Sequence, residues 1–412
     1  MAFLIEGRRP LCGKVVAQGA KNAVLPMLCA TLLCREPITL HGVPCIGDVT
    51  ALLDCLAALG VSVTHGEEGC VTLCAEEACP PTDTLHKVGE LRASAYLLGA
   101  ALARFGEGVI PIPGGCAFGT RPLDYHAAGF RALGAACEQT DSAIRVAWQD
   151  PRPTFFALPY PSVGATVNFI LAALGVAGES TLYGFAREGH VMDFINFLRT
   201  LGAKIVAEGN ALHIEGGGVL HGGEYSVLPD AIEAGTYLIA AAATGGKVTV
   251  EKSNYGELSP LLLAFGKMQI PFTLSGGSVT VYPAQKMRGT EIIAAPYPAF
   301  PTDLHPPIAV LLSATEGGSV CDLVWQERFS YVTELRKMGL CATRTPRTVS
   351  VSYSRLFGAE VVCPDLRGGA ALVIAALIGE GKTTLLGEEK LLRGYEGMPE
   401  KLRSLGADIV TL

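Results

Sequence analysis

Hydrophobic and polar positions follow one pattern that recurs six times along the chain. Each recurrence has an apolar run with helical spacing, a short β-branched run, a loop and a second helical run that ends in a turn. Each helix of the unit is expected to carry one apolar face and to pack it inward. In the first recurrence Leu52, Leu53, Leu56 and Leu59 form such a face on the second helix. The fourth recurrence follows the pattern least closely. The six closing turns are predicted at Gly60, Gly134, Gly202, Gln269, Gly339 and Gly406.

The spacing of these turns indicates the size of the repeated unit. Successive turns lie 67 to 74 residues apart. This is too long for a solenoid repeat and suits a module that contains a βαβ element. Six modules predict a two-domain α/β protein, an inside-out α/β barrel with three units per domain in pseudo-threefold symmetry. Residues 226–230 are a candidate crossover. The alternative, an α/β chain with chance similarity, does not explain the near-constant spacing.

Composition agrees with two soluble domains. The chain has 412 residues, of which 49% are hydrophobic and 17% charged, which excludes a disordered protein. A net charge of −7 gives no general attraction to nucleic acid or to an anionic membrane. An anionic ligand would therefore be held by local arginines and lysines.

The cysteines and the apolar runs indicate a cytoplasmic location. Thirteen cysteines are an odd number and have no recurring pair spacing, which favours reduced thiols. The one close cluster, Cys70, Cys74 and Cys79, lacks the second pair that a zinc site needs. The N-terminal run is too short for a signal peptide, and residues 371–378 are too few to span a membrane.

A glycine-rich segment, residues 114–125, is the first candidate for chemistry. It carries Cys116, with Arg121 five residues later and Asp124 just beyond. Its glycines leave the backbone free to bend, and Pro113 and Pro122 fix the two ends of the loop. A thiol beside a guanidinium predicts a reacting group close to an anionic substrate. The alternative is a surface turn with an incidental cysteine.

Two further segments have the residue types of an anion site. Lys21 and Asn22 stand between a strand-like run and a helix-like run, so they are expected at a helix N-terminus that favours an anion. The alternative is an asparagine cap beside a solvated lysine. Asp303, in a proline-rimmed turn, is a candidate base, or else a helix cap.

Three arginines are expected at or near the start of the second helix of a unit. They are Arg328, Arg367 and Arg393, and each could instead be a solvated surface residue.

Together these segments resemble the enolpyruvyl transferase family, and within it the UDP-N-acetylglucosamine 1-carboxyvinyltransferases of bacterial peptidoglycan synthesis. The resemblance covers essentially the whole chain. It implies domains at residues 22–228 and at 1–21 plus 229–412, with the active site in the cleft between them. The motifs that carry it are GAKNAVLPMLCATLL, ELRASAYLLGAALARFGEG, PGGCAFGTRPLD, SVGAT, FPTD, ERF, DLRGGAALV and RGYE.

The resemblance implies an addition followed by an elimination, with no metal and no cofactor. The partners are small molecules, UDP-N-acetylglucosamine and phosphoenolpyruvate. Cys116 would be the acid and Asp303 the base. Lys21, Arg121 and Arg393 would meet the phosphate, and Arg328 and Arg367 the carboxylate or the developing charge. Further substrate contacts are implied for Asn22, Arg92, Pro122, Leu123, Asp124, Tyr125, Ser162, Val163, Gly164 and Val324.

The chain departs from the family pattern at three places. Tyr160 and Ala231 stand where relatives have basic residues, and His305-Pro306-Pro307 replaces a glutamine-rich segment. Two alternatives stay open. One is a transferase acting on shikimate 3-phosphate, although that family lacks a cysteine on this loop. The other is a sugar-nucleotide-binding paralogue with weak activity.

Overall fold

The computed structural model describes residues 2–81, 95–111 and 123–412, and the chain forms two compact units. The split unit comprises residues 2–18 and Pro229–Leu412, and the continuous unit comprises the described residues from Gly19 to Leu228. The chain leaves the continuous unit within the predicted crossover at 226–230. The chain enters the continuous unit between Gln18 and Gly19, three residues before the predicted domain boundary between residues 21 and 22. Ala20 donates a backbone hydrogen bond to Leu228 (2.8 Å), which ties the start of the continuous unit to its end.

The described part of the continuous unit has three sheets, ordered β13-β3-β5-β4, β11-β12-β10-β9 and β6-β8-β7. The strands are β3 (Ile38–His41), β4 (Ser62–His65), β5 (Val71–Cys74), β6 (Glu107–Pro111), β7 (Ala135–Gln139), β8 (Ala143–Trp148), β9 (Phe155–Ala157), β10 (Gly178–Tyr183), β11 (Lys204–Glu208), β12 (Ala211–Gly216) and β13 (Gly223–Ser226). The helices are α1 (Lys21–Ala30), η1 (Thr31–Leu33), α2 (Gly47–Ala58), α3 (Ala95–Phe105), α4 (Asp124–Ala132), α5 (Val163–Leu174) and α6 (Gly189–Thr200).

The split unit also has three sheets in its described residues, ordered β21-β22-β1-β23, β15-β16-β14-β2 and β17-β18-β20-β19. The strands are β1 (Ala2–Glu6), β2 (Cys12–Val16), β14 (Lys247–Glu251), β15 (Phe272–Ser275), β16 (Ser278–Val281), β17 (Thr290–Ala294), β18 (Gly318–Asp322), β19 (Ala342–Arg344), β20 (Thr348–Val351), β21 (Glu360–Val362), β22 (Lys382–Leu386) and β23 (Asp408–Thr411). The helices are α7 (Ala231–Thr244), α8 (Tyr255–Met268), η4 (Thr302–Leu304), α9 (His305–Ser313), α10 (Ser330–Lys337), α11 (Leu366–Ile378), α12 (Glu389–Leu392) and α13 (Met398–Ser404).

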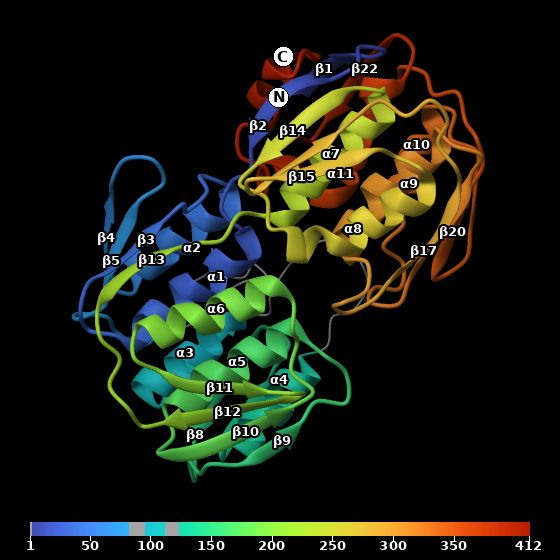
Figure 1. Ribbon diagram of the computed structural model, residues 1–412. Helices are drawn as coiled ribbons and strands as arrows, with labels where there is room; N and C mark the ends of the chain where they lie inside the picture. The colour runs from blue at the N-terminus through green and yellow to red at the C-terminus, as the bar shows by residue number, and fades with distance from the viewer. Residues whose placement is uncertain (1, 82–94, 112–122) are drawn as a thin grey trace. The chain divides into compact units, whose positions relative to one another are not determined.

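The N-terminal strands complete sheets that later segments build. β1 lies between β22 and β23 and is antiparallel to both, so Phe3 stands opposite Leu385 and Thr411. β2 runs parallel to β14, with Cys12 opposite Lys247. Both chain termini therefore lie in the split unit (Figure 1).

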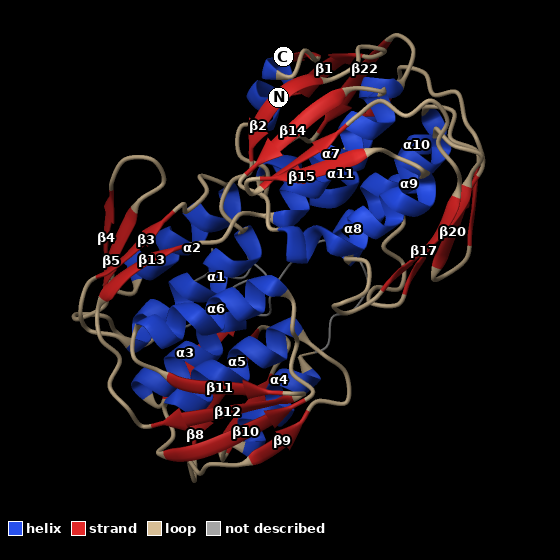
Figure 2. Cartoon of the chain, viewed as in Figure 1, coloured by secondary structure: helices blue, strands red, loops and turns tan. Residues whose placement is uncertain are grey.

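Helices form the interior of each unit, and the sheets lie outside them (Figure 2). In the split unit α7, α9 and α11 pack against one another. The prediction of one apolar face per helix holds for α2, whose Leu52, Leu53 and Leu56 are buried. It is wrong for α5 and α11, in which residues 165–174 and 367–377 are all buried. Neighbouring helices and sheets of the same unit cover these two helices on every side.

All six predicted closing turns have a left-handed backbone, with φ between 60° and 96°. Five of these positions are glycines, which adopt this conformation without a steric cost, and Gln269 adopts it at the C-terminus of α8. Each turn follows a helix and leads into an edge strand of a different sheet. These edge strands are β4, β7, β11, β15, β19 and β23.

None of the helices in the described residues combines the length and the apolarity that crossing a membrane requires.

Candidate active site

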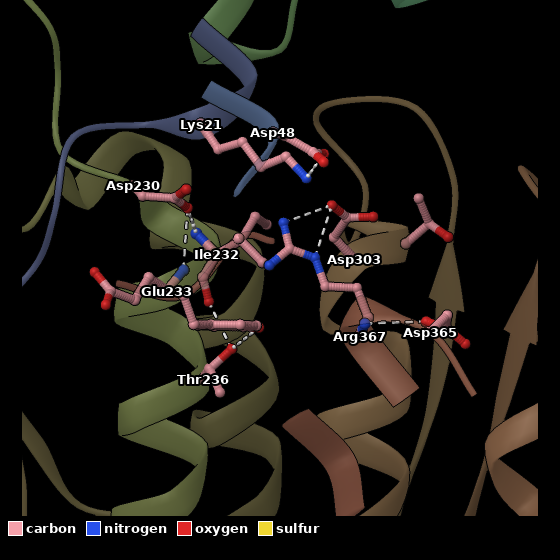
Figure 3. A network of polar contacts seen from close by, with 12 residues as sticks. Lys21, Asp48, Asp230, Ile232, Glu233, Thr236, Asp303, Asp365 and Arg367 are labelled. Carbon is pink, nitrogen blue, oxygen red and sulfur yellow. Dashed lines mark hydrogen bonds and ion pairs between the residues drawn. The ribbon is translucent and has the colours of Figure 1, made fainter. Parts of the chain in front are cut away.

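Asp303 lies in the short helix η4 and is held by two arginines of the split unit. Arg367 donates to Oδ2 through Nε at 3.1 Å and Nη2 at 2.9 Å, as Figure 3 shows. Arg328 Nη1 lies 2.8 Å from Oδ1. The arginine side chains are 2% and 5% exposed, whereas the carboxylate is 25% exposed. The carboxylate is therefore the most accessible member of this cluster.

The two arginines control the pKa of Asp303. Burial alone would raise this pKa, but the charges of Arg367 and Arg328 and their hydrogen bonds outweigh burial. They hold the pKa of Asp303 well below its ordinary value. Asp303 is thus firmly ionised, and it is a weak base while both guanidinium groups contact it.

Arg367 owes its position to a helix cap. Asp365 is the N-cap of α11, and its Oδ1 accepts hydrogen bonds from Arg367 N and Gly368 N, both at 3.0 Å. The expectation that Arg367 starts the second helix of a unit is wrong. Asp365 begins the buried helix α11, which precedes β22. Arg328, in contrast, lies just before α10, as predicted.

A buried carboxylate that the sequence did not reveal supports this cluster. Thr302 Oγ1 donates to Asp322 Oδ2 (2.6 Å) and accepts from Arg328 Nη1 (2.9 Å). The other oxygen, Asp322 Oδ1, accepts from the backbone N–H groups of Val324 and Trp325, both at 2.9 Å. Asp322 therefore fixes the turn that carries Val324, a predicted substrate contact. Its place at the end of a β-branched run, the last residue of β18, was the available signal.

In the continuous unit Lys21 is the first residue of α1, as predicted, and Asn22 follows it half-buried. Lys21 Nζ lies 2.6 Å from Asp48 Oδ2, with side chains 9% and 13% exposed (Figure 3). Asp48 occupies the first turn of α2 and was not predicted. Ala20 is the N-cap of α1, so Asn22 is not the cap that the alternative assumed.

The starts of α4 and α5 are brought together by His126. Ser162 caps α5, and its Oγ accepts from Ala165 N at 3.4 Å. A Cβ at Gly164 would lie 2.8 Å from two atoms of the His126 ring, so a larger residue there would displace this ring. His126 Nδ1 lies 2.7 Å from Asn168 Nδ2. Of the other predicted contacts here, Leu123 and Val163 are half-buried and Asp124 and Tyr125 exposed.

Arg393 follows the short helix α12, five residues before α13 begins. The next turn is fixed by Gln18, whose Nε2 donates to Gly394 O (3.0 Å) and whose Oε1 accepts from Glu396 N (2.8 Å). Gln18 in turn donates its backbone N–H to the buried Glu233 (2.6 Å). Gln18 is distant in sequence from this turn, and no local pattern marked it.

Four predicted site residues lie outside the described residues: Arg92, Cys116, Arg121 and Pro122. Within residues 2–81, 95–111 and 123–412, no three His, Cys, Asp or Glu side chains are grouped so that they could hold a metal ion.

Comparison with known proteins defines the class. The profile of the EPSP synthase (3-phosphoshikimate 1-carboxyvinyltransferase) family matches residues 5–402. The solved structure of the enolpyruvyl transferase NikO from Streptomyces tendae is 25% identical, with a TM-score of 0.90 over 99% of this chain and 98% of that one. An EPSP synthase from Acinetobacter baumannii shares the fold at 20% identity, with a TM-score of 0.76 over both whole chains.

Curated relatives narrow this class. The UDP-N-acetylglucosamine 1-carboxyvinyltransferase of Halothermothrix orenii is 40% identical over 99% of this chain and 98% of its own length. The enzyme of the same name from Clostridium botulinum is 39% identical over 99% of each chain. The chain therefore belongs to the EPSP synthase family and, within it, to the UDP-N-acetylglucosamine 1-carboxyvinyltransferases.

Proposed function

We propose that the protein transfers the enolpyruvyl group of phosphoenolpyruvate to the 3′-hydroxyl of UDP-N-acetylglucosamine and releases phosphate. The observation that carries this proposal is the accessible carboxylate of Asp303 between two buried arginines. It combines a proton acceptor with cations suited to a small anionic substrate. The identity to relatives of this name supports the choice of acceptor.

The proposed reaction has two steps. The 3′-oxygen bonds to C2 of phosphoenolpyruvate while the hydroxyl loses its proton and C3 gains one. The resulting tetrahedral adduct then loses phosphate from C2 and a proton from C3, which restores the double bond as a vinyl ether.

Asp303 would take the hydroxyl proton in the first step. Its arginine contacts make it a weak base, so the proposal requires those contacts to change. The carboxylate of phosphoenolpyruvate would draw Arg328 and Arg367 toward itself. Because an opposite charge lowers the pKa of a carboxyl group, this partial release would raise the pKa of Asp303 when the substrate is present.

Other charged residues would stabilise the substrate phosphate. We assign this role to Lys21, Arg121 and Arg393. Cations held in place before the reaction stabilise developing negative charge and need little reorganisation. Cys116 would deliver the proton to C3, since a thiol with an ordinary pKa near ~8.5 is mostly protonated at neutral pH and can still release its proton.

The nucleotide and sugar would contact the starts of α4 and α5 and the turn held by Asp322. The proximity of Leu123–Tyr125 to Ser162–Gly164 through His126 supports this assignment. The proposed contacts are Asn22, Arg92, Arg121, Pro122, Leu123, Asp124, Tyr125, Ser162, Val163, Gly164 and Val324.

We also propose that the two units are the two domains and that each contains three copies of one α/β unit in an inside-out arrangement. The support is the recurrence of the closing turns. Six left-handed turns, each leading into an edge strand of its own sheet, are what a sixfold repeat would produce.

A phosphate-release assay with each acceptor tests the proposed function. We expect phosphate release from phosphoenolpyruvate with UDP-N-acetylglucosamine and none with shikimate 3-phosphate. Release with shikimate 3-phosphate would favour the second candidate, which the name of the matching family profile supports. Binding of the UDP-sugar without turnover would identify a binding paralogue instead.

A further inference from the structure

His305 is completely buried at the start of α9 and has a polar partner for each ring nitrogen. Nδ1 lies 3.0 Å from Asp322 Oδ2, and Nε2 lies 2.8 Å from the hydroxyl of Tyr331. The edges of the Phe329 and Tyr331 rings close around the imidazole, with centroid distances of 4.8 and 5.5 Å. A polar side chain in this setting is strongly oriented, because each lost hydrogen bond would leave a buried polar atom without a partner.

The direction of every hydrogen bond around His305 follows from Asp322. An ionised carboxylate only accepts, so His305 Nδ1 and the Thr302 hydroxyl must both donate to Oδ2. The imidazole is neutral, since burial lowers the pKa of His305 against the opposing hydrogen bond and charge of Asp322. Its Nε2 therefore accepts the proton of the Tyr331 hydroxyl.

The hydrogen bonds lead from Asp322 through Thr302 and Arg328 to Asp303, the proposed base. Thr302 uses its proton on Asp322, so its oxygen is left to accept from Arg328 Nη1 at 2.9 Å. That same nitrogen lies 2.8 Å from Asp303 Oδ1. Two oxygens, one from the Thr302 hydroxyl and one from the Asp303 carboxylate, thus hold Arg328 Nη1 in place.

We propose that His305, Asp322 and Thr302 form a positioning relay that fixes Arg328 against Asp303 and, through the same Asp322 carboxylate, fixes the turn that carries Val324. None of the three is assigned to touch the substrate. The relay would couple the site of proton removal to the turn proposed to hold the UDP-sugar. Its catalytic consequence rests on the proposed function.

His305 departs from the family pattern, because His305-Pro306-Pro307 stands where that pattern is rich in glutamine. The imidazole reaches two partners with a rigid ring, which a flexible amide would do at a greater cost in side-chain entropy. The groups that face it are Asp322, Arg328, Asp365 and Tyr331.

The first test compares Thr302→Val with Thr302→Ser in the full-length protein. Valine keeps the shape and removes the hydroxyl, whereas serine keeps both hydrogen bonds. We expect Thr302→Val to lower kcat at least tenfold and to leave the KM for the UDP-sugar within about twofold, because Asp322 still holds the Val324 turn. Thr302→Ser should stay within about threefold of the wild type.

The pH dependence of kcat/KM distinguishes a role of Thr302 in positioning Arg328 from a general loss of structure in the variant. Two guanidinium groups face Asp303, Arg367 from α11 and Arg328 from the segment before α10. If Thr302→Val loosens Arg328, the acidic limb of the kcat/KM profile should move to higher pH, and Thr302→Ser should leave it in place. An unmoved limb together with unchanged kcat in Thr302→Val would overturn the relay.

Crystal structures of the ligand-free variants give a test that needs no activity. In Thr302→Val we expect Arg328 Nη1 to move away from Asp303 Oδ1 by about 1 Å or more, and in Thr302→Ser we expect the wild-type contact. Retention of that contact in Thr302→Val would refute the relay. A displaced Arg328 in a protein whose wild type shows no turnover would instead refute the proposed function and leave the relay standing.

Discussion

Arg367 contacts a single oxygen of Asp303 twice, through Nε at 3.1 Å and Nη2 at 2.9 Å. A lysine would place one charge at this position and lack the planar fork, so Arg367→Lys is not a conservative change. We expect kcat/KM to fall by at least ~100-fold, about 2.7 kcal/mol of transition-state stabilisation, with a normal circular dichroism spectrum. Arg355→Lys, at an exposed ion pair with Glu380, is the matched control and should keep full activity. Equal kcat/KM in the two variants would contradict the role of Arg367.

The pairing of Lys21 with Asp48 leads to a prediction about phosphoenolpyruvate binding. Asp48→Asn keeps the shape of the side chain but removes the charge that lies 2.6 Å from the buried ammonium. A less firmly held Lys21 should raise the KM for phosphoenolpyruvate and lower kcat/KM about tenfold, roughly 1.4 kcal/mol. Asp54→Asn changes an exposed carboxylate of the same helix and should have no effect. The proposed role of Lys21 would be in doubt if both variants bound phosphoenolpyruvate equally well.

Glu233 predicts how stability depends on pH. It is completely buried, with Lys401 Nζ at 2.7 Å and Gln18 N at 2.6 Å, and burial outweighs these contacts to raise its pKa to about 7. The unfolded value is near ~4.3, so the folded state binds this proton more tightly. The stabilising contribution is therefore full below ~4.3 and is lost as pH rises through about 7.

Urea unfolding from pH 5 to pH 8 measures this effect. The free energy of unfolding of the wild type should fall with pH more steeply than that of Glu233→Gln, by on the order of 2 kcal/mol over this range. Glutamine does not titrate, so the difference between the two curves isolates this one group. Parallel curves would show that Glu233 has the same pKa in the folded and unfolded chain.

Cys116 is predicted to be the cysteine that reacts fastest with a small anionic epoxide such as fosfomycin, and the UDP-sugar should accelerate the reaction. Burial raises the pKa of Cys29 and raises that of Cys55 to about 11, which lowers the reactive thiolate fraction of both. Cys116→Ala should lose labelling and most turnover, whereas Cys116→Asp should lose labelling and keep some turnover. Mass spectrometry of the labelled protein locates the adduct. An adduct on the exposed Cys12 or Cys45 would exclude the assignment.

The features that were predicted correctly depend on residues that are close together along the chain. The six closing turns each combine a helix end with a left-handed position, and Lys21 follows a strand and begins a helix. Periodicity and local turn chemistry reveal such features directly. The prediction of one apolar face failed for α5 and α11, which are buried on every side. The spacing of apolar residues in such a helix does not indicate which neighbours cover it.

The residues that the sequence missed act through partners far away in the chain. Asp48 pairs with a lysine one helix earlier, and Gln18 holds a turn near residue 394. Asp322 is an ordinary acidic residue until folding brings Thr302 to it. Their roles arise from tertiary contacts, and one sequence taken alone does not report these contacts.

The position of β1 between β22 and β23 sets an order for folding during synthesis. The described residues of the continuous unit, which ends at Leu228, can complete their contacts while the ribosome is still making the rest of the chain. β1 is made before the continuous unit and its two neighbours, β22 and β23, are made after it, so this strand stays unpaired for most of the synthesis of residues 2–412. Until then an apolar strand, in which Phe3 and Ile5 are destined for burial, offers unpaired edges to other chains. The growing chain is thus exposed to aggregation at β1, and a translational stall before residue 382 would prolong that exposure.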